Sequence, residues 1–215
     1  MWLINTHNGY KNSEGKRIPP IDINDYPAIK EHLDQYWNKL KKRQDKGKTH
    51  YNLRNCSYIE EFEKGKIVYM EIQTDNKKEG YDFPSFAFGM KGTIVLNTAY
   101  VLTGIGYKYI LGLLNSSLGE RLVKFYVTQL QKRQFRMLAM YVDNFPIPRI
   151  TKESQKPFET LVDKIITKKE HGEDTTAEER QIDIMVYKLY ELTYDEVQIV
   201  EPEFALTKEE YENYK

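Results

Sequence analysis

The chain has 215 residues, of which 40% are hydrophobic and 30% charged, and its 32 basic residues balance its 32 acidic ones. A chain of this length can bury a stable core without disulfides or metals, and zero net charge excludes a histone-like, uniformly basic protein. The single cysteine, Cys56, cannot form an internal disulfide, which fits a reducing, cytoplasmic location.

We expect neither a membrane-spanning segment nor a signal peptide. No apolar run approaches the ~20 residues that cross a membrane, so we expect no membrane partner. The opening MWLINTHNGYK lacks the basic leader and the apolar stretch of a signal peptide. It begins abruptly, and we therefore expect a fragment of a larger protein.

Residues 24–47 are predicted to form one long helix. Asn24 or Asp25 can cap it, Pro27 lies in its first turn and Gly47 follows its end. Apolar residues recur at helical spacing, and the last turns are basic, which suits the negative end of the helix dipole.

Three segments that are rich in β-branched and aromatic residues are predicted strands: 65–73, 83–89 and 93–104. Glycines in their connections favour the turns of a meander. Helical periodicity then runs through residues 107–130. Gly112 and Gly119 weaken it, so we expect a helix break or close packing near one of them.

The chain becomes extended at the prolines of NFPIPRI (144–150), which cannot continue a helix. Helical patterns return at 156–170 and 176–193, and we expect the acidic last ten residues to be disordered. Two pairs have the spacing of capping boxes: Thr176 with Glu179, and Thr193 with Glu196.

These elements predict an α+β fold: a twisted, mainly antiparallel sheet with packed helices, followed by a C-terminal helical pair. We expect a sheet-and-helix core over residues 1–150 and a helical segment over 151–215, both within one continuous region.

Catalytic motifs are missing. The sequence has no P-loop, no dinucleotide-binding glycine motif and no zinc or serine-hydrolase signature, and its four histidines are scattered. Arg54 could lower the pKa of Cys56, but a structural cysteine is the favoured interpretation. We expect no catalytic residue, no metal site and no cofactor in this chain.

Charge is unevenly distributed. Residues 30–54 hold eight basic and three acidic residues, residues 121–149 hold six and one, and residues 170–215 hold four and fourteen. Each run alone is typical of a solvated face. Together they favour one side that faces a polyanion and another that faces solvent.

Two segments have the residue types that contact nucleic acid. Lysines and arginines neutralise phosphates, glutamine pairs with adenine, and arginine pairs with guanine in the major groove. The candidate DNA-binding residues are Lys41, Lys42, Arg43, Lys46, Lys48, Tyr51, Arg54, Gln131, Lys132, Arg133, Gln134 and Arg136. In the first segment Asn52 and Asn55 also carry groups that read base edges.

A further pattern extends from about residue 18 to residue 201. It is carried by INDYPAIKEHLDQYWNKLKKRQDKGKTHYNLRNCSYIEEFEKGKIVYMEI (23–72), YVLTG (100–104), YKYILGLLNSSL (107–118), YVDNFPIPRI (141–150) and IDIMVYKLYELTYDEVQIVE (182–201). In this order the segments resemble the TaqI-like C-terminal specificity domain of DNA adenine-N6 methyltransferases and of type IIG restriction–modification enzymes. LLNSSL and NFPIP carry the resemblance most strongly.

The resemblance implies a target-recognition role on double-stranded DNA. Its partners would be the methyltransferase and nuclease domains of a parent protein, in which a separate domain binds S-adenosylmethionine and methylates a flipped adenine. The Asn-Pro-Pro-aromatic catalytic motif is absent, because the one Pro-Pro pair, in RIPPID (17–22), lacks both flanking residues. The recurring Y-x-L-R piece favours a structural or backbone-contacting role for Arg54.

Two interpretations stay open at this point. One is sequence-specific recognition of DNA. The other is an assembly module, whose helical tail docks on a methylase or nuclease partner while DNA contact is minor.

Overall fold

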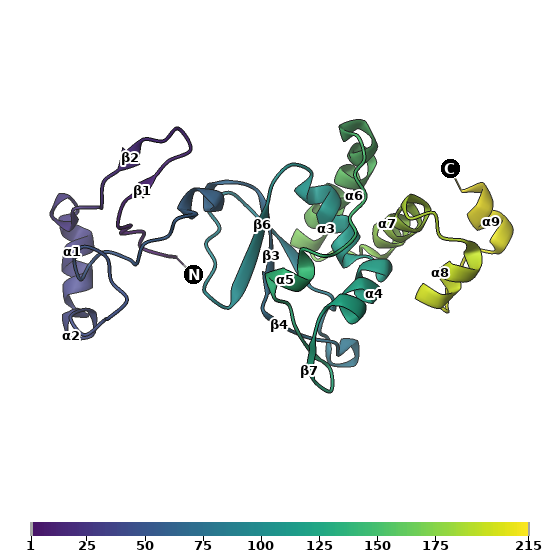
Figure 1. Ribbon diagram of the computed structural model, residues 1–215, viewed down its shortest axis with the longest axis horizontal. Coiled ribbons are helices and arrows are strands. Elements are labelled where there is room, and N and C mark those ends of the chain that lie inside the picture. The colour runs from purple at the N-terminus through teal and green to yellow at the C-terminus, as the bar shows by residue number, and fades with distance from the viewer. Residues whose placement is uncertain (1, 215) are drawn as a thin grey trace. The chain divides into compact units, whose positions relative to one another are not determined.

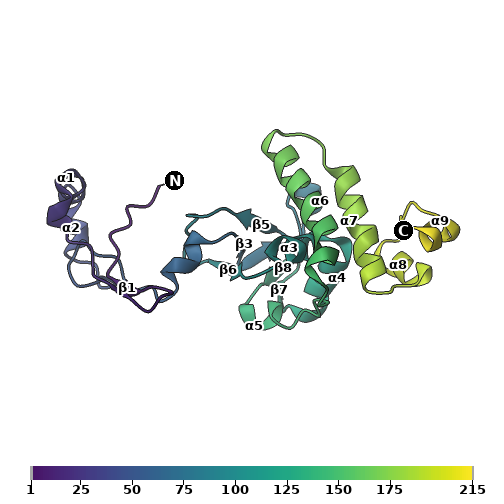
Figure 2. The same cartoon turned by 90° about the horizontal axis from the view of Figure 1, so that it is seen from above.

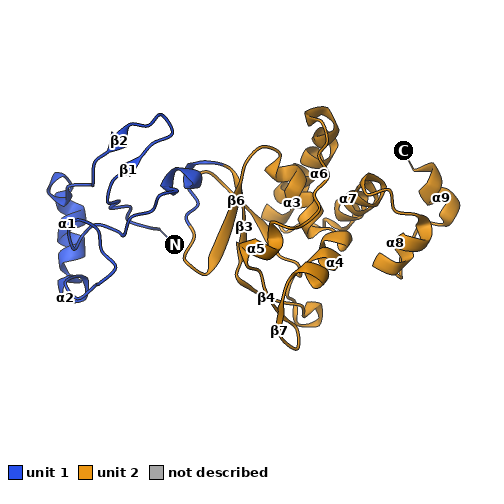
Figure 3. Cartoon of the chain, in the orientation of Figure 1, with its two compact units in different colours: residues 1–64, 92–94 blue, residues 65–91, 95–215 orange. Residues whose placement is uncertain are grey.

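The computed structural model describes residues 2–214, which divide into two compact units (Figure 3). Unit 1 comprises residues 1–64 and 92–94, and unit 2 comprises residues 65–91 and 95–215. The division predicted at residue 150 does not coincide with this boundary, because the helices after residue 150 pack on helices before it. The functional division at residue 150 stays a prediction.

Unit 1 consists of short elements. They are β1 (Tyr10–Lys11), β2 (Arg17–Ile18), η1 (Ile23–Asp25), α1 (Pro27–Asp34), α2 (Trp37–Leu40) and η2 (Ile59–Glu63). The prediction of one helix over residues 24–47 was wrong in extent. The helix is interrupted at Tyr36, whose φ of −103° and ψ of 13° are not helical, and α2 ends at Leu40. The basic residues 41–48 therefore lie in turns and a loop.

Little apolar surface is buried in unit 1. Among the described residues of the unit, Ile23 and Phe62 are the buried hydrophobic side chains, and the polar Thr6 and Asn52 are buried as deeply. The hydrogen bonds of those polar groups therefore carry much of the organisation of this unit.

Unit 2 holds two small antiparallel sheets (Figure 1). In one, β3 (Lys66–Met70) is central between β5 (Phe86–Gly89) and β6 (Ala99–Thr103). In the other, β8 (Gln134–Arg136) is central between β4 (Ile72–Thr74) and β7 (Gln129–Gln131). The strand predicted over 65–73 is thus split at Glu71 between the two sheets, with the short η3 (Lys77–Glu79) following β4.

The helical segment predicted over 107–130 forms two helices, α3 (Tyr107–Asn115) and α4 (Ser117–Tyr126). They are separated at Ser116, whose hydroxyl accepts a hydrogen bond from the Gly119 amide and caps α4. The prediction was a break or close packing near Gly112 or Gly119, and the break lies close to Gly119. Gln129 and Leu130 were wrongly placed at the end of this helix, because Val127 is already extended and buried and the two residues belong to β7.

One apolar core joins the sheets of unit 2 to its helices. Ile67 of β3, Leu113 of α3 and Val123 of α4 are at most 2% exposed. Val162 and Val186, from the two long helices after residue 150, belong to the same core. The tail of the chain is therefore part of unit 2.

Only helices follow α5 (Ala139–Val142) in the described chain, as the prolines of NFPIPRI predicted. They are α6 (Lys152–Glu170), α7 (Thr176–Leu189), α8 (Tyr194–Val200) and α9 (Lys208–Asn213). In both views α8 and α9 lie at the end of unit 2 away from the β5-β3-β6 sheet (Figures 1 and 2). The α+β class with a helical C-terminus is confirmed.

The end of the chain was expected to be disordered, and the structure corrects this. Thr207 and Glu210 form a capping box at the start of α9, and Tyr211 is 2% exposed and donates to the carbonyl of Leu192. The box predicted at Thr193 is confirmed. The box predicted at Thr176 is wrong, because the N-cap residue of α7 is Thr175, whose side chain makes no capping hydrogen bond.

Asp183 of α7 holds a half-buried carboxylate against the start of α4. Its oxygens accept from the Ser117 amide at 2.7 Å and from the Ser117 hydroxyl at 3.1 Å. Burial outweighs these bonds and raises the pKa of Asp183 from 3.8 to about 6. The folded chain therefore binds a proton on the Asp183 carboxylate more tightly than the unfolded chain does.

This predicts a pH-dependent gain from Asp183→Asn. Since the folded pKa is raised, the contribution of Asp183 to stability falls as pH rises from about 4 to about 6. The advantage of the variant over the unchanged chain should therefore grow with pH, and it should be larger near pH 8 than near pH 5 by on the order of 1 kcal/mol. Urea unfolding at both pH values measures it. Exposed Asp143→Asn is the control, and a pH-independent difference would contradict the prediction.

Candidate nucleic-acid interface

The first candidate segment is organised around Asn52, which is 1% exposed. Its carboxamide oxygen accepts from the Thr49 amide at 3.1 Å and from the Thr49 hydroxyl at 2.7 Å. Its amide group donates to the carbonyl of Ile21 at 2.9 Å. Asn52 therefore closes the loop and cannot read a base edge, contrary to the expectation from its residue type.

Arg43 also serves the loop. Its guanidinium donates to the carbonyl of His50 at 3.0 Å and to that of Asn52. These bonds hold residues 50–52 against the chain that follows α2. Arg43 was a DNA-binding candidate, and the structure gives it a structural role at a half-buried position.

Tyr51 and Arg54 each have an acidic partner. The Tyr51 hydroxyl donates to Asp34 at 2.5 Å, and Asp34 pairs with Lys30 at 2.7 Å, an arrangement that lowers the pKa of Asp34. Arg54 lies 3.4 Å from Asp45 in an exposed ion pair. Exposed pairs of this kind are weak, so Arg54 can exchange its carboxylate for a phosphate.

Four lysines of the first segment keep their charge available. In the described part of the chain, Lys41, Lys42 and Lys48 are exposed and make no ion pair. The Lys46 ammonium lies 3.3 Å from a ring nitrogen of His50, again without a carboxylate partner within residues 2–214. These are the groups that suit phosphate contacts in unit 1.

The second candidate segment is the β7–β8 hairpin of unit 2. Phe135 points into the core, where its ring lies 5.0 Å from that of Phe83, so its neighbours Gln134 and Arg136 lie on the opposite face. The anchor fixes the hairpin to β4. The register places Arg136 opposite Ile72 and Gln134 opposite Thr74.

The candidates on this hairpin differ in how far they are engaged. Arg136 pairs with Glu71 at 2.9 Å, and Arg133 donates to Asn76 at 3.0 Å. Lys132 at the turn is exposed. Gln131 and Gln134 are exposed cross-strand neighbours, and neither side chain makes a hydrogen bond within the described residues. The structure brings these two amides together and leaves them available.

The two segments lie in different units, so their predicted action on one face of a duplex stays a prediction. The exposed face of the β4-β8-β7 sheet includes Ile72, which is 43% exposed and was not among the candidates. Its alternation with the buried Gln73 is the sequence signal that could have found it.

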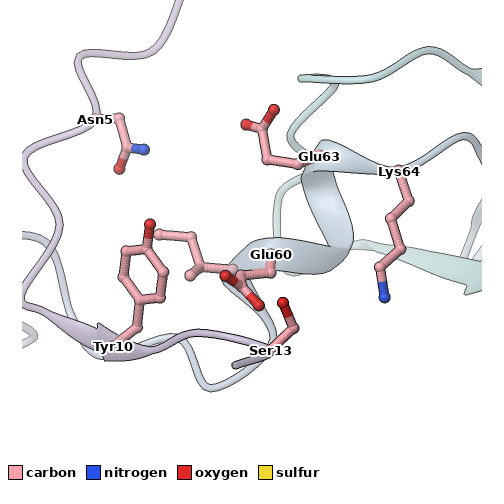
Figure 4. A pocket seen from close by; sticks show the side chains of 7 residues that line it. Asn5, Tyr10, Ser13, Glu60, Glu63 and Lys64 are labelled. Atoms are coloured by element: carbon pink, nitrogen blue, oxygen red, sulfur yellow. The ribbon is translucent and has the colours of Figure 1, made fainter. Parts of the chain in front are cut away.

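A pocket of about 260 Å³ in unit 1 is lined by two carboxylates, Glu60 and Glu63, and by one ammonium, Lys64, so it is acidic on balance. Tyr10 and Ser13 approach it from the β1 segment, and Glu60 and Glu63 from η2 (Figure 4). Two carboxylates disfavour a phosphate there. Residues 2–214 contain no cluster of three side chains suited to a metal ion, and none of the described helices combines the length and hydrophobicity needed to span a bilayer.

An α+β chain that presents unpaired lysines on a loop and free amides on a hairpin has the features of a nucleic-acid recognition domain. The chain belongs to the family of TaqI-like C-terminal specificity domains, whose family model matches residues 14–147. The match includes both candidate segments and ends before α6, short of the extension to residue 201 that the resemblance suggested. No curated protein matches the chain.

Proposed function

We propose that this chain is the sequence-specific double-stranded DNA recognition domain of a restriction–modification DNA methyltransferase, with or without a fused nuclease. The observation that carries the proposal is the β7–β8 hairpin, whose buried Phe135 leaves Gln131 and Gln134 free on the exposed face. Membership of a specificity-domain family supports it.

The proposed division of labour follows from the exposed groups. Lys41, Lys42 and Lys48 contact phosphates without sequence preference, and Gln131 and Gln134 contact base edges. Methyl transfer and the binding of S-adenosylmethionine belong to another domain of the parent protein. The proposed location is the cytoplasm, which suits a chain with one thiol.

Fluorescence anisotropy on duplexes with a randomised centre, at low and physiological salt, tests the proposal. We expect weak binding by the chain alone, about 10⁻⁵ M or weaker at physiological salt. Replacing Lys41, Lys42 and Lys48 by alanine should weaken binding to all sequences alike and flatten the salt dependence by roughly 0.9 in log–log slope per lost contact. The charge-matched control replaces the exposed Lys11, Lys152 and Lys156.

Replacing Gln131 and Gln134 by alanine should instead change which sequences are enriched among the bound duplexes, as read by sequencing them. The reason is that a good bidentate pair is worth ~1–3 kcal/mol of discrimination between bases. Unchanged enrichment would refute base readout by the hairpin. Equal losses from both lysine sets would refute the assignment of phosphate contacts to the loop.

The acidic tail supports a second candidate function, docking on a methylase or nuclease partner. Ile199 of α8 is 73% exposed amid the acidic residues of this region. If no duplex binding is detectable even at low salt, the assembly role becomes the better account of this chain.

A further inference from the structure

Unit 1 presents an aromatic surface on α2 and the loop that follows it. Trp37 is the first residue of α2, and its side chain is 37% exposed. Its indole meets the His50 ring nearly perpendicularly, with centroids 5.4 Å apart, and lies 5.6 Å from the Tyr51 ring at an interplanar angle of 33°. Part of a large flat ring therefore faces solvent from a supported position.

The support is built from both sides. The hydroxyl of Tyr51 is fixed by Asp34 of α1, and Lys30 of the same helix lies over the Tyr51 ring, 5.7 Å from its centroid. Arg43 holds the backbone of His50 through a bond of 3.0 Å. These contacts order the rings in advance. Stacking a flat ligand on Trp37 would therefore cost little rotamer entropy of the protein side chains.

Positive charge surrounds this surface. Lys41 follows Trp37 by one helical turn, with its amide bonded to the Trp37 carbonyl at 2.9 Å, and Lys42 is next to it. Lys46 approaches both ring nitrogens of His50, at 3.3 and 3.4 Å. The nearby acids Asp34 and Asp45 are already paired with bases.

An exposed indole with unpaired lysines around it suits a ligand that has flat apolar faces and negative charge. Single-stranded nucleic acid has both, and stacking of its bases on aromatic side chains is tolerant of sequence. A duplex hides the faces of its bases and offers only base edges and phosphates, so it has nothing to stack on the indole. The acidic pocket of unit 1, by contrast, has the wrong charge for either.

We infer that the Trp37 surface binds single-stranded DNA, stacking an unpaired base on the indole while Lys41, Lys42 and Lys46 contact the adjacent phosphates. This goes beyond duplex recognition by the hairpin, because it uses another unit and another form of DNA. Lys41 and Lys42 would contact phosphates in both forms of DNA. The two activities are separable at Trp37, which stacks only on an unpaired base, and at Gln131 and Gln134, which read only base edges of a duplex.

Intrinsic fluorescence tests the inference without altering Trp37. The sequence has two tryptophans, so Trp2→Phe in the full chain leaves Trp37 as the only indole. A short oligothymidylate should quench its fluorescence. A backbone of the same length that carries phosphates but no bases should bind about tenfold more weakly and quench little, because stacking contributes ~1–3 kcal/mol per base.

Variants complete the test by anisotropy. Trp37→Ala should lose about tenfold in affinity for the oligothymidylate, whereas Tyr36→Ala, which removes a neighbouring ring that is 47% exposed, should change it little. Trp37→Phe retains a ring and should lose less. Equal binding of the two oligonucleotides, or an absence of quenching, would overturn the inference. Duplex binding that persists in either case would leave the hairpin proposal intact.

Discussion

Replacing Asn52 by alanine is expected to open unit 1 while unit 2 stays folded. The change removes the acceptor for two Thr49 groups and the donor to the Ile21 carbonyl. Buried polar groups left without partners cost ~1–3 kcal/mol each, so we expect a loss of about 3 kcal/mol. Unit 1 has little apolar core to compensate for the loss, since Ile23 and Phe62 are its buried hydrophobic side chains among the described residues. Unit 2 has its own apolar core and should stay folded.

Native-state hydrogen exchange measures the effect residue by residue. The Leu53 amide, bonded to the Thr6 carbonyl at 2.8 Å, should exchange about a hundredfold faster in the variant. The Leu113 amide, within α3 of unit 2, should be unchanged. Exposed Asn55→Ala is the matched control. Unchanged Leu53 protection in Asn52→Ala would show that the loop does not depend on this side chain.

The dependence of unit 1 on a few polar contacts explains why its structure was hard to predict. The apolar spacing over 24–47 predicted a continuous helix, and Pro27 does lie at the start of α1. The interruption at Tyr36 lets Trp37 meet the rings of His50 and Tyr51, and this contact spans more than twelve residues of sequence. Local periodicity contains no information about such a contact.

In unit 2 the apolar and proline patterns were more informative. The strand-rich segments, the helix break near Gly119 and the all-helical tail after NFPIPRI follow from propensity and turn chemistry. The split of residues 65–73 at Glu71 does not, because one half pairs with β5 and β6 and the other with β8. A continuous β-branched run does not reveal which partner each half will find.

The candidate site shows the same limit at the level of side chains. Residue type alone made Arg43 and Gln134 equal candidates, yet Arg43 is used to hold a loop and Gln134 is exposed without a partner. Asn52 had the chemistry of a base-reading residue and proved to be buried. Exposure and partners distinguish a contact residue from a structural one, and both are decided by tertiary packing.

Replacing Gly119 by alanine should destabilise unit 2 by about 3 kcal/mol. A Cβ atom at Gly119 would lie 2.5 Å from the carbonyl oxygens of Leu113 and Leu114, which are backbone atoms and cannot rotate away. The shift needed to relieve this contact also disturbs the cap, in which Ser116 accepts from the Gly119 amide at 3.0 Å. Urea unfolding of the full chain measures the loss.

Gly112→Ala is the matched control, since both glycines lie in helices of the same core. A Cβ at Gly112 would meet the Val162 and Ile182 side chains at 3.2 and 3.7 Å, and side chains can adjust by a few tenths of an ångström. Alanine also favours a helix interior by roughly 1 kcal/mol over glycine, which offsets the crowding. We therefore expect a change within about 1 kcal/mol. Equal destabilisation by the two substitutions would contradict the assignment of Gly119 as the point of close approach between α3 and α4.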